Sequence, residues 1–266
     1  MFKTTIILAS LILLPSCATT PQISSIARSE LAPTGKLRVG INFGNVLLAA
    51  KDPASGEPRG VAMDLARELG RRVGVPIEIV AFDTAGKMAN AVKTGVWDVA
   101  FLAADPARVN EISFTAAYAE IETTYLVPPG SPLRTIADVD REGVRIAVAA
   151  KGAPDLFLTR NLQRARLERA PGAAGSFKLF VAGKLEALAG LRPVLMTYAE
   201  KLPGSRVLDG RFSTVQQAIG TPRGRDAGAE YLRQFVEDVK ATGLVAKTIE
   251  KNGVRGLSVA PMAAAQ

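Results

Sequence analysis

The chain has 266 residues, 48% of them hydrophobic and 22% charged, and a formal net charge of +8. These proportions are ordinary for a globular protein and argue against disorder outside the chain ends. Histidine is absent and cysteine occurs once, which excludes Ser-His-Asp and Cys-His nucleophile systems, His-ligated metals and intramolecular disulfides. We therefore predict no metal, no cofactor and a fold that relies on its hydrophobic cores.

The chain begins with a pattern typical of an export signal. Residues 1–3 supply a positive charge, and the apolar stretch 6–14 is far shorter than the ~20 residues of a membrane span. Ser16 and Cys17 follow, and a small residue before the only cysteine resembles a bacterial lipoprotein cleavage site. We therefore expect residues 1–17 to be a signal peptide with Cys17 lipidated. The alternatives are secretion of a soluble form and a buried N-terminal helix.

Residues 18–35 are rich in Ser, Thr, Ala and Pro without a sustained period, and we expect them to form a tether. The Lys and Arg residues are scattered among acids rather than gathered in a stripe, and export also argues against nucleic acid as a partner. The sequence thus predicts a periplasmic or otherwise extracytoplasmic protein that is attached to the membrane by a lipid anchor only.

Strands and helices alternate in the first half of the chain, which indicates an α/β fold. Val61, Leu65 and Leu69 recur every four residues and predict an amphipathic helix. The nearly continuous apolar stretch 96–103 is typical of a strand buried on both faces. We expect strands over 37–43, 76–82, 96–103 and 124–127, and helices over 60–75 and 86–95.

A second α/β unit follows the stretch 128–132, whose prolines and glycine break the pattern. The segment 192–202 is compatible with either a strand or a helix, and the small apolar residues 257–266 predict a frayed tail. For the rest we expect strands over 144–150, 176–183 and 213–222, and helices over 155–169, 184–191, 226–240 and 244–253.

Six motifs occur in order along the chain: LRVGI, GVAMDLARELGRRVGV, GVWDVAF, DPARVNEISFTAAY, VRIAVAAKG and ATGLVAKTIEKNG. Together they resemble the bacterial extracellular solute-binding proteins of family 3, the periplasmic receptors of polar amino acid ABC transporters. The resemblance implies a two-lobed, periplasmic-binding-protein-like fold of type II with a ligand cleft between the lobes. Lobe one would hold residues 36–126 and 218–256, and lobe two residues 127–217, with crossing strands near 125–127 and 217–219 as the hinge.

Arg108 is the strongest candidate for a ligand contact. The buried strand ends at Ala103, and the polar turn containing Asp105 places Arg108 beyond the carboxyl edge of a parallel sheet, where α/β folds bind ligands. A guanidinium there offers a planar fork for a carboxylate. The resemblance implies the same role, because the family's arginine at this position clamps the ligand's α-carboxylate. The alternative is a surface arginine paired with Asp105 or Glu111.

The resemblance also assigns ligand contacts to positions where this chain departs from the family. Asn42 matches a polar residue after the first strand, and Asn45 matches an aromatic stacking position. Ala103 replaces a Ser or Thr, and Lys151 and Gly152 open a loop that has lost its hydroxyl groups. We expect all of these residues, together with Asp105 and Arg108, to contact the ligand.

The aspartate that pairs with the ligand's ammonium group in the family falls near Leu191, where this chain has no acid. An ammonium buried without a counter-charge is costly. Arg108 and Lys151 would also favour negative charge in a closed cleft. We therefore expect a small organic anion, or an amino acid derivative with its amine masked, rather than a free cationic amino acid.

The resemblance implies a binding protein rather than an enzyme: a monomeric substrate-binding component of an ABC transporter, which captures a small carboxylate-bearing solute for an inner-membrane permease. One alternative is a periplasmic dehydratase-like enzyme acting on a cyclic carboxylate, which would need an acid in the cleft such as Glu186 or Glu200. Another is a sensor that kept the fold.

Overall fold

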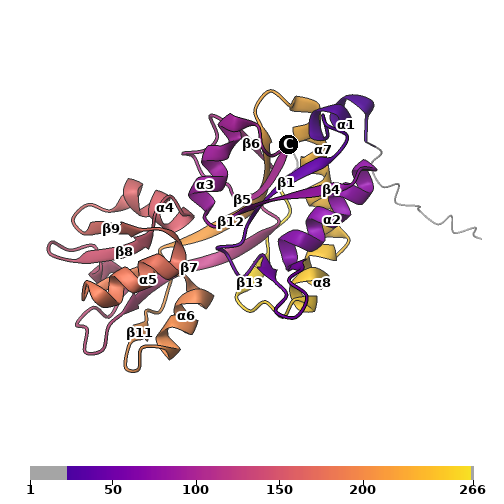
Figure 1. Ribbon diagram of the computed structural model, residues 1–266. Helices are drawn as coiled ribbons and strands as arrows, with labels where there is room; N and C mark the ends of the chain where they lie inside the picture. The colour runs from indigo at the N-terminus through magenta and orange to yellow at the C-terminus, as the bar shows by residue number, and fades with distance from the viewer. Residues whose placement is uncertain (1–22, 265–266) are drawn as a thin grey trace, which may run out of the picture.

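The protein is described here by a computed structural model of residues 23–264. The predicted signal peptide and Cys17 lie outside these residues. Figure 1 shows two lobes that are connected by long strands. Within residues 23–264, none of the helices combines the length and the apolar character that crossing a membrane requires.

The first lobe is formed by two separate parts of the chain, one before and one after the second lobe (Figure 1). Its elements are α1 (Ser25–Leu31), β1 (Leu37–Asn42), β2 (Ala50–Lys51), β3 (Pro58–Arg59), α2 (Val61–Val73), β4 (Ile77–Phe82), α3 (Ala85–Asn90), a 3-10 helix η1 (Ala91–Thr94), β5 (Val99–Ala103), β6 (Ile112–Phe114), α7 (Asp226–Ala241), α8 (Leu244–Lys251) and β13 (Leu257–Val259).

The second lobe is formed by the continuous stretch between them, and two long strands reach it from the first lobe. The long strands are β7 (Ala119–Val127) and β12 (Ser213–Pro222). The remaining elements are η2 (Ile136–Asp138), β8 (Arg145–Ala149), α4 (Ala153–Asn161), β9 (Arg166–Ala170), α5 (Gly172–Ala182), β10 (Ala187–Leu191), α6 (Arg192–Glu200) and β11 (Arg206–Val207).

One mixed sheet runs through both lobes in the order β4-β1-β5-β12-β7-β10-β8-β9. In the first lobe β1 lies parallel to β4 and β5, and in the second lobe β8 lies parallel to β9 and β10. Between these parallel groups, β12 and β7 pair antiparallel. The carboxyl ends of the parallel strands in each lobe therefore lie near the pair of strands that joins the lobes, where α/β sheets place ligands.

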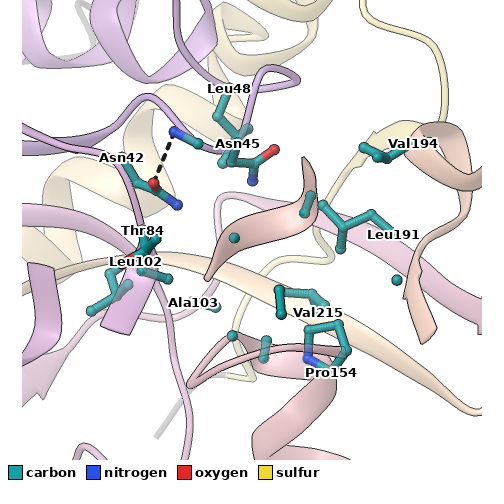
Figure 2. Close-up of a pocket in the computed structure, with 18 of the residues that line it drawn as sticks. Asn42, Asn45, Leu48, Thr84, Leu102, Ala103, Pro154, Leu191, Val194 and Val215 are labelled. Carbon is teal, nitrogen blue, oxygen red and sulfur yellow. Dashed lines mark hydrogen bonds between the residues drawn. The ribbon is translucent and has the colours of Figure 1, made fainter. Parts of the chain in front are cut away.

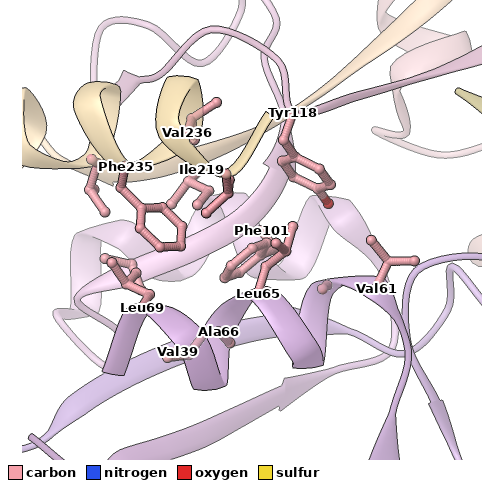
Figure 3. Packing of buried hydrophobic residues seen from close by; sticks show 14 of the residues in the cluster. Val39, Val61, Leu65, Ala66, Leu69, Phe101, Tyr118, Ile219, Phe235 and Val236 are labelled. Carbon is pink, nitrogen blue, oxygen red and sulfur yellow. The ribbon is translucent and has the colours of Figure 1, made fainter. Parts of the chain in front are cut away.

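Each lobe has its own hydrophobic core. Figure 3 shows Leu65 and Leu69 of α2 packed among Phe101 of β5, Ile219 of β12 and Phe235 of α7. The four-residue spacing along α2 places its apolar side chains on one face, so that face is buried, as the sequence predicted. The helix ends at Gly74, whose left-handed backbone (φ 74°) favours glycine.

The core of the second lobe lies on both faces of β8, β10 and β7. One cluster contains Ile146 and Ala189, and the other contains Leu126, Phe180 and Leu195. Because the two lobes have separate cores, each can move as a unit about the strands that join them.

The elements of the second lobe differ from the sequence prediction. The helix expected over 155–169 ends at Asn161, and β9 follows at the edge of the sheet, where exposed charged side chains are common in strands. The strand expected over 176–183 lies within helix α5, whose Phe177 and Phe180 face the core at helical spacing. The helix expected over 184–191 contains β10, a central strand of small and apolar residues.

Two segments expected to be unstructured are part of the fold. In the predicted tether, Ser24 caps α1 by accepting a hydrogen bond from the Ala27 amide (3.1 Å), and Leu31 is fully buried. In the predicted tail, β13 pairs with β7, and Ala260 is buried. The tether and tail predictions are therefore wrong over 25–31 and 257–260, because both segments bury apolar side chains against the first lobe.

Candidate functional site

A cavity of about 120 Å³ lies between the lobes. Figure 2 shows Asn42, Thr84 and Ala103 of the first lobe on one side, and Leu191 and Val194 of the second lobe opposite them. Val215 and Pro154 form its floor in this view. The cavity thus collects the ends of β1 and β5 from one lobe, the end of β10 and the start of α6 from the other, and part of the joining strand β12.

Most of the cavity wall is apolar. The first lobe contributes Ile41, Leu48, Phe101 and Leu102, and the second lobe contributes Leu188, Leu191, Val194, Leu195 and Tyr198. The Tyr198 ring stacks on Phe177, with ring centroids 4.2 Å apart, so neighbouring packing fixes its position. Burial raises the pKa of the Tyr198 hydroxyl, which therefore stays neutral at physiological pH.

Arg108 lines this cavity and is almost completely buried. Its Nη1 donates to the carbonyl of Ala103 (2.7 Å), and its Nη2 donates across the cleft to the carbonyl of Lys151 in the second lobe (2.9 Å). Burial lowers the pKa of the guanidinium to about 10, against the opposing effect of Asp105. Arg108 therefore remains cationic at neutral pH and spans both lobes.

The alternative expected for Arg108, an ion pair with Asp105 or Glu111, does not occur. Asp105 instead receives two hydrogen bonds from Arg160 of α4, at 2.9 and 3.0 Å. Glu111 pairs with Lys93 at 2.8 Å. The predicted ligand contact Asp105 lies outside the apolar cavity, beside a second hollow between the lobes, and holds the lobes together through Arg160.

Four further predicted contacts, Asn42, Asn45, Ala103 and Gly152, line the apolar cavity. The Asn42 side-chain oxygen accepts from the Gly44 amide at 3.0 Å (dashed in Figure 2), and that of Asn45 accepts from Leu47 at 3.3 Å. The two side-chain NH2 groups are thereby oriented by the loop.

Lys151 differs from the prediction, because its side chain does not line the cavity. It passes over Gly86 of the first lobe, where an added Cβ would lie 2.7 Å from that of Lys151. Its backbone is left-handed (φ 57°), and its amide donates to the Asp155 carboxylate at 2.7 Å. Lys151 therefore contributes its carbonyl to Arg108, while its side chain is not part of the cavity lining.

Sequence reasoning missed the wall formed by α6. Val194, Leu195 and Tyr198 stand at helical spacing and all line the cavity. The pattern i, i+1, i+4 could have identified them, and Pro193 in the first turn also favours a helix start. Val194 and Thr197 are β-branched, and such residues are also common in strands, so the segment is compatible with either structure.

Three acidic side chains that could pair with a cationic group of the ligand, Asp83, Asp155 and Glu186, are each paired with a cation of the protein. Among the described residues that line the cavity, Asp83 alone is acidic, and its side chain is exposed at the rim. The Asp83 carboxylate lies 2.7 Å from the Lys87 ammonium, and the hydrogen bond from Lys87 lowers the pKa of Asp83. Asp155 accepts from Arg169 (2.9 Å). Glu186 pairs with Arg145 (2.9 Å), which lowers its pKa. Within the described residues, no group of three or more acidic or cysteine side chains could hold a metal ion.

Comparisons with known proteins agree with this geometry. The family described as bacterial extracellular solute-binding proteins, family 3, matches residues 37–254. The chain is 25% identical over 201 residues to the glutamine-binding protein of Geobacillus stearothermophilus, which covers 73% of this chain and 75% of that protein.

Solved structures with the same fold include the following two. The solute receptor for L-cysteine of Neisseria gonorrhoeae aligns with a TM-score of 0.74 at 20% identity, over 88% of this chain and 96% of that one. An ancestral amino acid-binding protein, described as a precursor of cyclohexadienyl dehydratase, aligns with a TM-score of 0.70 at 24% identity, over 84% and 98%. These likenesses confirm the two-lobed fold that the sequence predicted.

Proposed function

Because the chain belongs to the bacterial extracellular solute-binding proteins of family 3, as its sequence predicted, we propose that it is the solute receptor of an ABC transporter. In this proposal it captures a small solute that bears a carboxylate. The lobes close around the solute by bending at β7 and β12 near the predicted boundaries 126/127 and 217/218, and an inner-membrane permease receives the closed form.

The observation that carries this proposal is the buried guanidinium of Arg108 in the cavity between the lobes. Two of its N–H groups are used by main-chain carbonyls, and a guanidinium has five. Its described acidic neighbours are paired with other cations. A ligand carboxylate would supply the missing counter-charge and receive the remaining donors. Asn42 and Asn45 would add neutral hydrogen bonds.

A dehydratase-like enzyme remains the second candidate, because one structural neighbour is named as the precursor of such an enzyme. That chemistry needs a protonated carboxylic acid beside the substrate. Asp83 is exposed and its lowered pKa keeps it ionised. Glu186 is paired with Arg145, Glu200 is exposed, and neither lines the cavity. These positions favour binding over catalysis.

The family is extracellular, and we propose that this protein works in the periplasm as a monomer, tethered through a lipid on Cys17. The +8 charge of the chain is compatible with a protein held near an anionic membrane surface.

A thermal-shift screen of the exported, purified protein against the amino acids and a series of small carboxylates tests the proposed function. A ligand that binds the native state raises the melting temperature with concentration, by mass action. We expect saturable stabilisation by at least one carboxylate-bearing solute, and impaired uptake of that solute when the gene is deleted. Stabilisation by none of them would contradict the proposal, and conversion of a bound cyclic carboxylate to product would favour the enzyme.

A further inference from the structure

We infer that the ligand is a small carboxylate with an apolar body and no free ammonium group. This inference rests on the proposed function and narrows it to a chemical class. Three features of the cavity lead to it: one buried cation, a described lining whose one acid is exposed and paired with Lys87, and a wall made largely of alkyl and aromatic groups.

The buried guanidinium of Arg108 favours a ligand with a negative charge. Arg108 is 7% exposed, and its guanidinium contacts two neutral carbonyls. A buried charge without an opposite charge is unfavourable. Because the carbonyls come from different lobes, the guanidinium is held in place by closure, with its remaining donors available to a carboxylate in the cavity.

An ammonium group on the same ligand would have no such partner. Asp105 is bound by Arg160, Asp155 by Arg169, and Glu186 by Arg145. Asp83, the acidic residue of the lining, is at the rim with its carboxylate on Lys87. An α-amino acid would therefore bury its ammonium among apolar and neutral polar side chains, without an opposite charge and at a large cost in affinity.

The apolar side chains that line the cavity favour a ligand whose remainder, apart from the carboxylate, is apolar. Leu191, Val194 and Leu195 face Leu48 and Phe101 across the cavity. A charged ligand side chain would lose its hydrogen bonds to water there and regain few of them, because the polar lining consists of a few neutral side chains beside Arg108 and the rim residue Asp83. The volume of about 120 Å³ is close to that of an engineered apolar cavity of ~150 Å³ that binds benzene. A branched aliphatic body or a small ring suits this space.

A matched set of three solutes tests the inference by calorimetry: 4-methylpentanoate, leucine, which adds an α-ammonium, and 4-methylpentanamide, which lacks the negative charge. We expect 4-methylpentanoate to bind, leucine to bind at least about 100-fold more weakly, and the amide not to bind measurably. Leucine binding as tightly as 4-methylpentanoate would overturn the inference, and so would tight binding of glutamine or arginine.

A pair of variants at Leu191 tests whether a new carboxylate in the cavity increases the affinity for a ligand with an ammonium group. Leu191 is half-buried, lines the cavity and is the N-cap of α6 without a capping side chain. Asp and Asn are both favourable N-caps, so Leu191→Asp and Leu191→Asn should both fold. Only the aspartate offers a counter-charge for an ammonium. We expect Leu191→Asp to gain affinity for leucine by at least about tenfold relative to Leu191→Asn.

The outcomes separate the inference from the proposed function. Tight binding of an α-amino acid by the wild-type protein is consistent with the proposed receptor function and refutes only the inference that the ligand is an apolar carboxylate. Equal leucine affinities of Leu191→Asp and Leu191→Asn also count against the inference. A protein that binds none of the amino acids or carboxylates refutes both.

Discussion

The ion pair between Asp105 and Arg160 joins the two lobes, and its loss should weaken ligand binding without touching the cavity. Asp105 follows β5 in the first lobe, and Arg160 belongs to α4 in the second. The bidentate bonds of 2.9 and 3.0 Å can exist only when the lobes are close together. Replacing Arg160 by Gln therefore removes an interaction that is specific to the closed form.

The magnitude follows from the exposure of the two partners. The Asp105 side chain is 7% exposed and that of Arg160 is 39% exposed, so the pair lies between a surface pair of ~0–1 kcal/mol and a buried one of ~3–5 kcal/mol. We assign it about 1–2 kcal/mol of closure free energy. If closure is required for tight binding, affinity falls by a factor of about 5–30.

The assay is calorimetry with the most stabilising solute, combined with small-angle scattering of the empty protein. We expect Arg160→Gln to bind about 5–30-fold more weakly and to have a larger radius of gyration, whereas Arg164→Gln, at an exposed arginine of the same lobe, should behave as wild type. Coupling in a double-mutant cycle with Asp105→Asn isolates the pair. Unchanged affinity and radius in Arg160→Gln would refute the reasoning.

Three further predictions concern the fold and its location. Asp98 is fully buried and pairs with Arg38 and Arg225, whose side chains are each 21% exposed. Replacing it by Asn should destabilise the protein by about 3 kcal/mol in urea unfolding, because two partly buried arginines lose their shared carboxylate; an unchanged midpoint would contradict this. Hydrogen bonds from Arg71 and then Arg72 lower the Glu68 pKa from 4.5 to about 2, so its stabilising contribution is present above pH 4.5 and is lost as pH falls toward 2; a Glu68→Gln variant should lose less stability over that interval. Cell fractionation should find wild type in the membrane and Cys17→Ala in the soluble periplasm, and fully soluble wild type would exclude the lipid anchor.

Apart from α1 and β13, the elements of the first lobe could be predicted well because they have strong periodic patterns. The four-residue repeat of apolar residues in α2 predicts a helix, and the continuous apolar stretch of β5 predicts a buried strand. In the second lobe, β9 is a charged edge strand and α5 is a helix with a weak apolar face, so local pattern alone suggested the opposite. Pairing with β8 makes 166–170 a strand, and packing of Phe177 and Phe180 against the second lobe accompanies the helix α5; both are tertiary interactions.

In the candidate site, too, some residues could be placed from the sequence and others could not. Positions given by strand ends, such as Arg108, Asn42 and Ala103, could be placed in the cavity from the sequence, because the topology fixes where strands end. The side chains of Asp105 and Lys151 were misplaced, because their partners Arg160 and Gly86 come from the opposite lobe. Contacts between distant segments leave no local pattern that a single sequence could reveal.

The central claim is that Arg108 holds a ligand carboxylate in the cavity between the lobes. The most direct measurement is calorimetric titration of wild type and Arg108→Gln with the solute that most stabilises the exported protein, with circular dichroism confirming that both are folded. We predict that the variant loses about 2–5 kcal/mol of binding free energy, because a charge-assisted fork is replaced by a neutral amide. Equal affinities in the two folded proteins would contradict the account.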